Sequence, residues 1–234
     1  MKNYIETVGR SLTDSLPVAG GRAVALVVLV LCARPADRLS AQSVLDQFSY
    51  DSLRASGLGI ELGPLGTSRL RGAITGGLRF DAGTIAPRVR VVVGLSYFRS
   101  EFSQHEITNF ATRLRGLVQD PDSNFTINVG RIFWSDLTGD LDFQYAIPQS
   151  PGITTFLGLG VGVHWRRGQG SAINGTFVQD ALDGLFPAAN ATVGAEFAVS
   201  RNLRFTLSGR GVVSEGLSTV SLASGLMYRF RGAR

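Results

Sequence analysis

Charged side chains recur at alternate positions of several apolar segments. Of all residues in the chain, these are the ones best suited to ion pairing or proton transfer. They share a face with glycine, serine and threonine, opposite an aliphatic face. In a narrow, poorly solvated interior, unpaired charge is costly and paired charge is tolerated. The pattern therefore predicts a buried ion-pair network, with a gated pore or proton path as the alternative. The predicted members are Glu61, Arg79, Arg90, Asp140, Asp142, Glu196, Arg204, Arg210 and Arg229.

Histidine is the other residue type that could do chemistry here. The chain has 2 histidines, His105 and His164, too few for a His-based metal site, so we expect no metal and no cofactor. His164 could act as a general base, but its position in the alternating pattern places it on the charged face, and the sequence fixes no serine beside it. The alternating glycines of Gly158-Leu159-Gly160-Val161-Gly162 are not followed by a helix-forming segment, which disfavours a phosphate-binding loop. We predict no catalytic residue and no enzyme.

A period of two dominates the chain from residue 52 onward, which is typical of strands with two different faces. Short connections (81–87, 148–152 and 200–202) alternate with longer ones (63–70, 99–134 and 166–189), as in an antiparallel up-and-down barrel. Most segments reach the ~9–11 residues that a tilted transmembrane strand needs. The sequence thus predicts eight strands, at 52–62, 71–80, 88–98, 135–147, 153–165, 190–199, 203–213 and 219–230.

Aromatic residues lie toward the ends of these segments and aliphatic residues occupy their middles. Two aromatic rims around an aliphatic band are typical of a transmembrane β-barrel, because amphipathic rings are stable at headgroup level. We therefore favour an all-β, eight-stranded transmembrane barrel over a soluble barrel or sandwich with its apolar face inside. The predicted girdle comprises Phe80, Tyr97, Tyr145, Trp165, Phe197, Phe205, Tyr228 and Phe230.

Two of the long connections have apolar residues at helical spacing. One set runs from Ile107 to Val118 and the other from Phe177 to Phe186. Each predicts a short amphipathic helix in an outer loop. The two helices are expected either to cap the barrel mouth or to present a surface for lipopolysaccharide, a partner or a small ligand.

The N-terminal region has the features of an export signal. Arg22 precedes the 11-residue apolar run 23–33, which is too short to span a membrane as a helix, and small residues precede Gln42. We predict a signal peptide at 1–41, a periplasmic segment at 42–51, the barrel at 52–230 and a C-terminal extension at 231–234. The formal charge of +5 is spread along the chain without a basic cluster, so nucleic-acid binding is not expected.

The last segment places Leu222, Leu226, Tyr228 and Phe230 on one face and ends in an aromatic residue. This pattern, with the strand topology and the rims, resembles the small bacterial outer-membrane β-barrels of OmpA and OmpX type. The resemblance implies an outer-membrane location, contact with outer-membrane lipid and lipopolysaccharide, recognition of the last strand by the barrel-assembly machinery, and a monomer. Proteins of this type have structural, adhesive, defensive or enzymatic roles, and we predict a structural or surface-interaction role with a charge-filled lumen. A narrow channel or carrier for small apolar molecules and a lipid-modifying enzyme are the alternatives.

Overall fold

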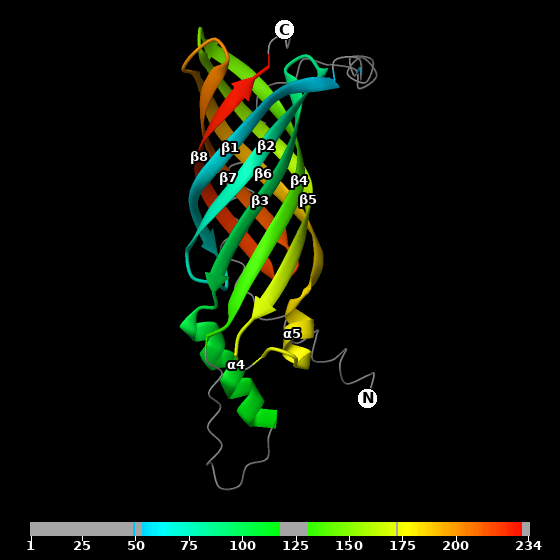
Figure 1. Ribbon diagram of the computed structural model, residues 1–234, viewed down its shortest axis with the longest axis vertical. Helices are drawn as coiled ribbons and strands as arrows, with labels where there is room; N and C mark the ends of the chain where they lie inside the picture. Colours follow the sequence, from blue (N-terminus) through cyan, green and yellow to red (C-terminus); the bar gives the residue numbers. More distant parts are fainter. Residues whose placement is uncertain (1–48, 50–52, 118–130, 172, 231–234) are drawn as a thin grey trace, which may run out of the picture. The chain divides into compact units, whose positions relative to one another are not determined.

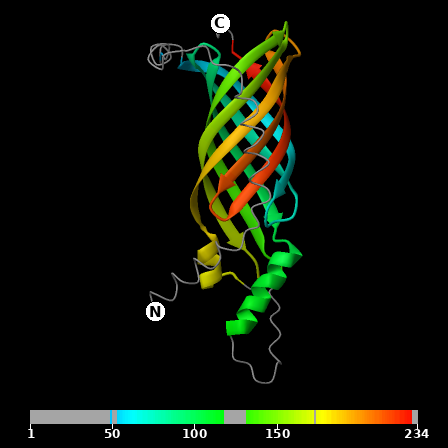
Figure 2. The same cartoon turned by 180° about the vertical axis from the view of Figure 1, so that it is seen from behind.

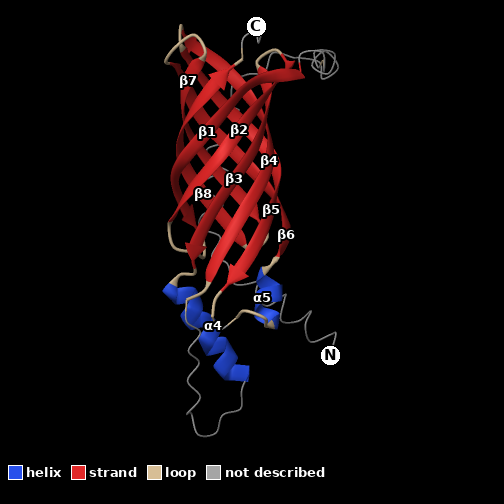
Figure 3. Ribbon diagram, viewed as in Figure 1, coloured by secondary structure: helices blue, strands red, loops and turns tan. Residues whose placement is uncertain are grey.

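Antiparallel strands form a closed barrel in the computed structural model, which describes residues 49, 53–117, 131–171 and 173–230. Each strand pairs with its neighbour in sequence, and β1 pairs with β8 to close the barrel (Figures 1 and 3). The strands are β1 Leu53–Thr67, β2 Ala73–Ala86, β3 Val89–Glu101, β4 Phe133–Ser150, β5 Ile153–Gln169, β6 Gly184–Ala198, β7 Leu203–Ser214 and β8 Leu217–Arg229. The predicted fold class is confirmed.

The barrel has two different ends. The turns β2–β3, β4–β5 and β6–β7 are short and lie at one end, hereafter the turn end, where β1 begins and β8 finishes. The opposite end, hereafter the helix end, carries α4 Gln104–Leu117 and α5 Phe177–Leu182 (Figures 1 and 2). Glycines with positive φ close the β4–β5 and β7–β8 hairpins, at Gly152 and Gly216, where an L side chain would be strained.

The strands reach further than the period-two pattern predicts. They are 12 to 18 residues long, and β1, β4 and β5 all extend beyond their predicted bounds at the helix end. The predicted second helix is too long, since α5 ends at Leu182 while Leu185 and Phe186 belong to β6. Backbone pairing with β5 fixes these two residues in a strand, because His164 and Trp165 are their register partners.

The two faces of the sheet differ sharply. Arg79, Asp142 and Glu196 are buried inside the barrel, whereas Val161, Leu159 and Ile60 are about three-fifths exposed on the outside. Among the described residues no helix is both long and apolar enough to cross a membrane. The predicted signal peptide at 1–41, the segment at 42–51 except for residue 49, and the extension at 231–234 lie outside the described residues.

Candidate functional site: the charged lumen

One strand shows how the lumen is organised in layers. Strand β4 begins at the helix end and places Asp136, Asp140, Asp142 and Gln144 on the inner face in succession. All four are buried, with exposures of 5% or less. Each contributes to a cluster of polar side chains, so the lumen contains a helix-end, a middle and a turn-end cluster.

The turn-end cluster comprises Asp81, Arg90, Glu196 and Arg229, with two positive and two negative charges. Glu196 from β6 lies 2.5 Å from Arg90 of β3 and 3.1 Å from Arg229 of β8. Asp81 lies 2.5 Å from Arg229 and 3.8 Å from Arg90. Arg90 also donates to Gln144 at 2.9 Å. Each carboxylate therefore faces both guanidinium groups, and the formal charges within the cluster cancel.

The middle cluster comprises Glu61, Arg79, Asp140, Asp142 and Arg210. Arg79 of β2 donates to Asp140 at 2.5 Å and to Glu61 at 2.6 Å. Arg210 of β7 lies 2.9 Å from Asp140 and donates to Asp142 at 2.5 Å. Because β7 and β4 lie three strands apart in an eight-stranded barrel, the Arg210 contacts cross the lumen.

The helix-end cluster comprises Asp136, Thr138, His164 and Arg166. The Nδ1 atom of His164 lies 2.9 Å from both Asp136 oxygens and 2.8 Å from the Thr138 hydroxyl. Arg166 donates to Asp136 at 3.1 Å and to the Glu215 carbonyl at 2.6 Å. His164 is only 3% exposed and lies inside the barrel. An acid is therefore within hydrogen-bond reach of His164, but the pair lies in the lumen and not at the lipid edge.

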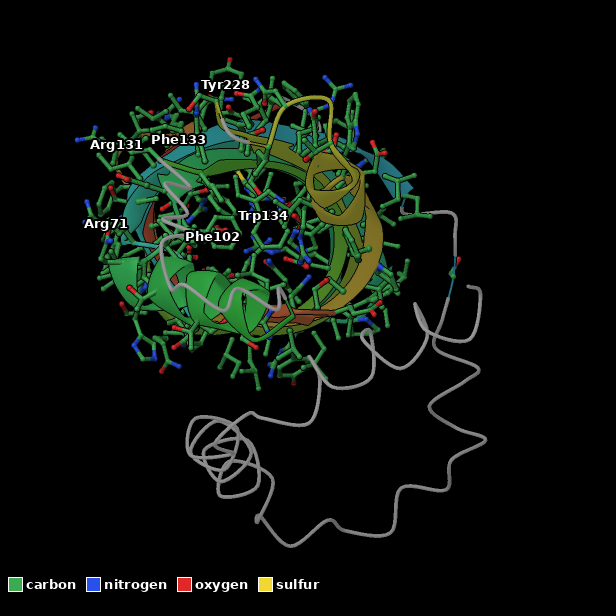
Figure 4. All side chains as sticks on the ribbon, turned by 90° about the horizontal axis from the view of Figure 1, so that it is seen from below. Arg71, Phe102, Arg131, Phe133, Trp134 and Tyr228 are labelled. Carbon is green, nitrogen blue, oxygen red and sulfur yellow. The ribbon has the colours of Figure 1, made fainter. Side chains whose placement is uncertain are left out.

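Apolar side chains cover the lumen at the helix end. Leu65, Leu70, Phe98, Trp134 and Leu217 form one buried cluster, hereafter the mouth cluster. The Trp134 ring stacks on Phe102 at a centroid distance of 5.3 Å, and its indole N–H donates to the Leu182 carbonyl at 3.1 Å. Seen along the barrel axis, Phe102 and Trp134 point over the mouth (Figure 4). This cluster separates the charged layers from the outside.

A small cavity lies between the helix-end and middle clusters. The space open to the centres of water molecules is about 40 Å³, and Arg79, Asp140, His164, Asn190 and Arg210 are among the residues that line it. One water needs roughly 10–15 Å³ of such volume, so the cavity has room for a few waters and not for a larger organic ligand. Among the described residues, no group of three or more His, Cys, Asp or Glu side chains is arranged to hold a metal ion.

The outer surface is a continuous apolar belt. Along β5, Leu157, Leu159, Val161, Val163 and Trp165 are all exposed. Soluble monomers rarely expose an apolar surface of this extent, whereas a transmembrane barrel requires an outward-facing apolar band. The predicted soluble alternative is therefore wrong, because the aliphatic face points outward and the charged face inward. The chain has the fold of a small outer-membrane β-barrel protein.

The known proteins that this chain resembles are solved structures of other small barrels. No protein-family model matches the sequence, and no curated protein matches it either. The Neisserial surface protein A structure is 11% identical with a TM-score of 0.49, covering 74% of this chain and 96% of that one. Ail of Yersinia pestis, in complex with the heparin analogue sucrose octasulfate, is 12% identical with a TM-score of 0.42, covering 75% and 99%. The N-terminal barrel domain of Pseudomonas aeruginosa OprF is 15% identical with a TM-score of 0.41, covering 75% and 98%.

This outer-membrane barrel has its predicted aromatic residues on the outside. Phe80, Tyr97, Tyr145, Trp165, Phe197, Phe205 and Tyr228 are exposed, and Phe230 is half-buried. Tyr97 and Trp165 flank Leu137 in one row toward the helix end, since each is its register partner. Phe197 and Phe205 pair with each other near the turn end. An even-numbered, closed antiparallel barrel with such a surface locates the protein in the bacterial outer membrane.

The structure brings together most of the residues that were predicted to share the lumen. Arg204 is the exception, since it is half-buried on β7 and forms no ion pair with the residues that the structure describes. Three charged participants were missed, namely Asp81, Asp136 and Arg166. Asp81 and Arg166 fell in segments expected to be connections, although both continue the parity of their strands. The alternation of β4 did place Asp136 on the inner face, so its parity was the available signal.

Proposed function

We propose that the protein is a non-enzymatic, structural component of the outer membrane with a closed lumen, and that its helix end carries a surface for envelope components. The observation that carries this proposal is the set of ion pairs that cross the lumen. Arg210 bridges β7 to β4, and Arg90 bridges β3 to β6. Charge-assisted contacts of this kind hold opposite walls together.

The arrangement of the layers supports a closed barrel. An eight-stranded barrel is only wide enough for side chains to fill its interior. Here the turn-end and middle clusters fill two levels and the mouth cluster fills a third, leaving a cavity of about 40 Å³ between them. An ion entering the lumen would have to displace paired charges at two successive levels.

Contacts at the helix end favour a model in which the two helices form a cap packed onto the barrel. Ile107 of α4 and Leu182 of α5 both contact the small buried cluster of Ile132 and Ile173. Leu182 and Phe102 also contact the mouth cluster. The two helices therefore share one apolar base above the lumen, which favours the cap over two independent binding arms.

The geometry of the lumen gives less support to a carrier or to a lipid-modifying enzyme. A carrier for small apolar molecules needs an apolar path, but the lumen is lined with paired charges. A lipid-modifying enzyme needs a base aligned with a nucleophile at the bilayer edge. His164 faces Asp136 inside the barrel instead, and His105 is exposed. Recognition of β8 by the barrel-assembly machinery and a monomeric state stay predictions.

Planar-bilayer recording tests the closed lumen. The purified barrel is fused into bilayers, and insertion is verified by co-flotation with vesicles and by the gel shift of heat-unfolded protein. A porin in the same bilayers is the positive control. We expect no conductance steps from this protein at membrane potentials where the porin conducts. Regular, reproducible steps from the purified protein would contradict the proposal.

A further inference from the structure

Two exposed arginines on the lipid-facing side of the helix end have no carboxylate partner among the described residues. Arg99 of β3 and Arg167 of β5 are both register partners of Ser135 on β4. The three residues form one row across neighbouring strands, and all three belong to the outward-facing parity. Strands lie about 4.8 Å apart, so the two arginine Cα atoms are separated by roughly 10 Å. Arg99 leans toward Phe133, on the helix-end side of the row, and Arg167 leans toward Trp165, on the side of the barrel middle. The two side chains can therefore contact separate phosphate groups of one ligand.

The level of this row relative to the membrane follows from the aromatic rim. Tyr97, Leu137 and Trp165 form the next outward-facing row toward the barrel middle. Aromatic rings of this kind mark the headgroup level. The arginine row lies two residues beyond the aromatic row. Because the strands rise ~3.3 Å per residue and tilt ~40°, the two rows are about 5 Å apart along the membrane normal. The arginine row therefore lies at the level of lipid headgroup phosphates.

Aromatic stacking holds both guanidinium groups without using up their donors. The Arg99 guanidinium carbon lies 4.9 Å from the centre of the Phe133 ring, and that of Arg167 lies 4.3 Å from the Trp165 ring. A ring occupies the flat face of a guanidinium and leaves the N–H groups at its edge directed elsewhere. The two side chains are thereby positioned for bidentate contacts to phosphate oxygens.

The neighbouring charges add to a positive surface. Arg71 and Arg131 are well exposed, with side-chain exposures of 59% and 79%, and both pair with the single carboxylate of Glu101. Figure 4 shows Arg71 and Arg131 on the outside of the barrel, on the same side as Phe133. Asp183 is a second acid here, because its carboxylate accepts from the backbone N–H of Gly168, next to Arg167. Among the described residues, these four arginines and two acids have a net charge of +2.

We propose that Arg99 and Arg167 form a binding site for the phosphate groups of a phosphorylated glycolipid in the outer leaflet, such as lipopolysaccharide. The proposal rests on the proposed function in one respect, namely that the helix end faces outward, as the longer connections of such barrels do. Tyr97 and Trp165 mark the boundary between acyl chains and headgroups, and the arginine row meets the first phosphates above that boundary.

The test measures lipid binding by the purified barrel in a non-ionic detergent. The probes are lipopolysaccharide and the same lipopolysaccharide after enzymatic dephosphorylation, with inorganic phosphate as a free-anion arm. We expect the wild-type barrel to bind the phosphorylated form at least about tenfold more tightly than the dephosphorylated form, which corresponds to about 1.4 kcal/mol. Millimolar inorganic phosphate should compete only weakly, because it lacks the acyl chains that the rim contacts.

Three variants locate the effect. R99Q/R167Q should lose the preference for the phosphorylated lipid, while R99K/R167K, which retains charge but not the planar fork, should recover part of it. R201Q removes one exposed arginine at the turn end and should bind like the wild type. Folding of each variant is verified by the heat-induced gel shift. The site is overturned if R99Q/R167Q binds like the wild type, if R201Q weakens binding equally, or if dephosphorylation has no effect.

The outcomes for the site and for the proposed function can be separated. Conductance by the wild-type barrel would contradict the closed lumen and leave the lipid preference intact. Surface proteolysis of whole cells that cleaves at the turn end instead of the helix end would contradict the orientation, and with it this site. Loss of phosphate selectivity in a non-conducting barrel of the expected orientation would contradict the site alone.

Discussion

Glu196 is the residue whose removal should most clearly reveal the lumen network. It is 2% exposed and contacts two guanidinium groups, Arg90 at 2.5 Å and Arg229 at 3.1 Å. Replacing Glu196 with Ala leaves Asp81 as the single acid facing both arginines, with the Arg90 contact at 3.8 Å. Removing one member of a buried ion pair typically costs about 3–5 kcal/mol, because the partner charge remains buried. We expect Glu196→Ala to lower the free energy of unfolding by that amount.

The measurement is urea unfolding of the barrel in detergent micelles or lipid bilayers, followed by tryptophan fluorescence. Glu101→Gln is the matched control, because it removes a carboxylate from an exposed ion pair at the helix end, where such pairs contribute about 0–1 kcal/mol. The reasoning is refuted if Glu196→Ala costs no more than Glu101→Gln. That result would mean that the lumen charges are hydrated, and an open pore would gain support.

Three further predictions test the packing, the membrane surface and the absence of catalysis. Gly94→Ala should destabilise the barrel by about 1–3 kcal/mol, because a Cβ would overlap the middle cluster, whereas Gly139→Ala, with open space around it, should stay within about 0.5 kcal/mol of the wild type in urea unfolding. Val161→Arg in the apolar belt should cost about 2–4 kcal/mol and Val199→Arg, beyond the strand end, only about 0–1, so equal costs in bilayer unfolding would argue against a lipid-facing belt. The barrel incubated with lipid A and phospholipid should release no acyl chains, and release that disappears in His164→Ala would show an enzyme.

The two faces of the barrel could be predicted from the sequence because side chains alternate between the faces of a strand, and the strands keep a regular register away from the turn end. Val161 and Gly160, for example, are assigned to opposite faces by parity alone. Which face meets lipid was decided by the positions of Tyr97, Trp165 and the other rim aromatics. The ion-pair partners could not be assigned, because parity gives the face of a residue and not its height in the lumen. Arg90 and Glu196 meet only through the stagger of the strands.

The ends of the elements were the least predictable part of the fold. The segment Gly63-Pro64-Leu65-Gly66 was predicted to be a loop, yet β1 continues through it, because β2 still supplies register partners such as Ile74. Helical spacing near Leu185 was also misleading, because pairing with β5 outweighs local propensity there. Asp81 was missed because the predicted strand ended at Phe80, whereas β2 continues to Ala86.

The two tryptophans allow a direct test of the central assignment, in which the rim faces lipid and the mouth cluster faces inward. Trp165 is 45% exposed on the outside, and Trp134 is 6% exposed within the mouth cluster. Quenching by brominated lipids can be measured separately in Trp134→Phe, which retains Trp165, and in Trp165→Phe, which retains Trp134. We predict strong quenching of Trp165, greatest when the bromines lie nearest the headgroups, and weak quenching of Trp134. Equal quenching of the two, or stronger quenching of Trp134, would contradict the assignment.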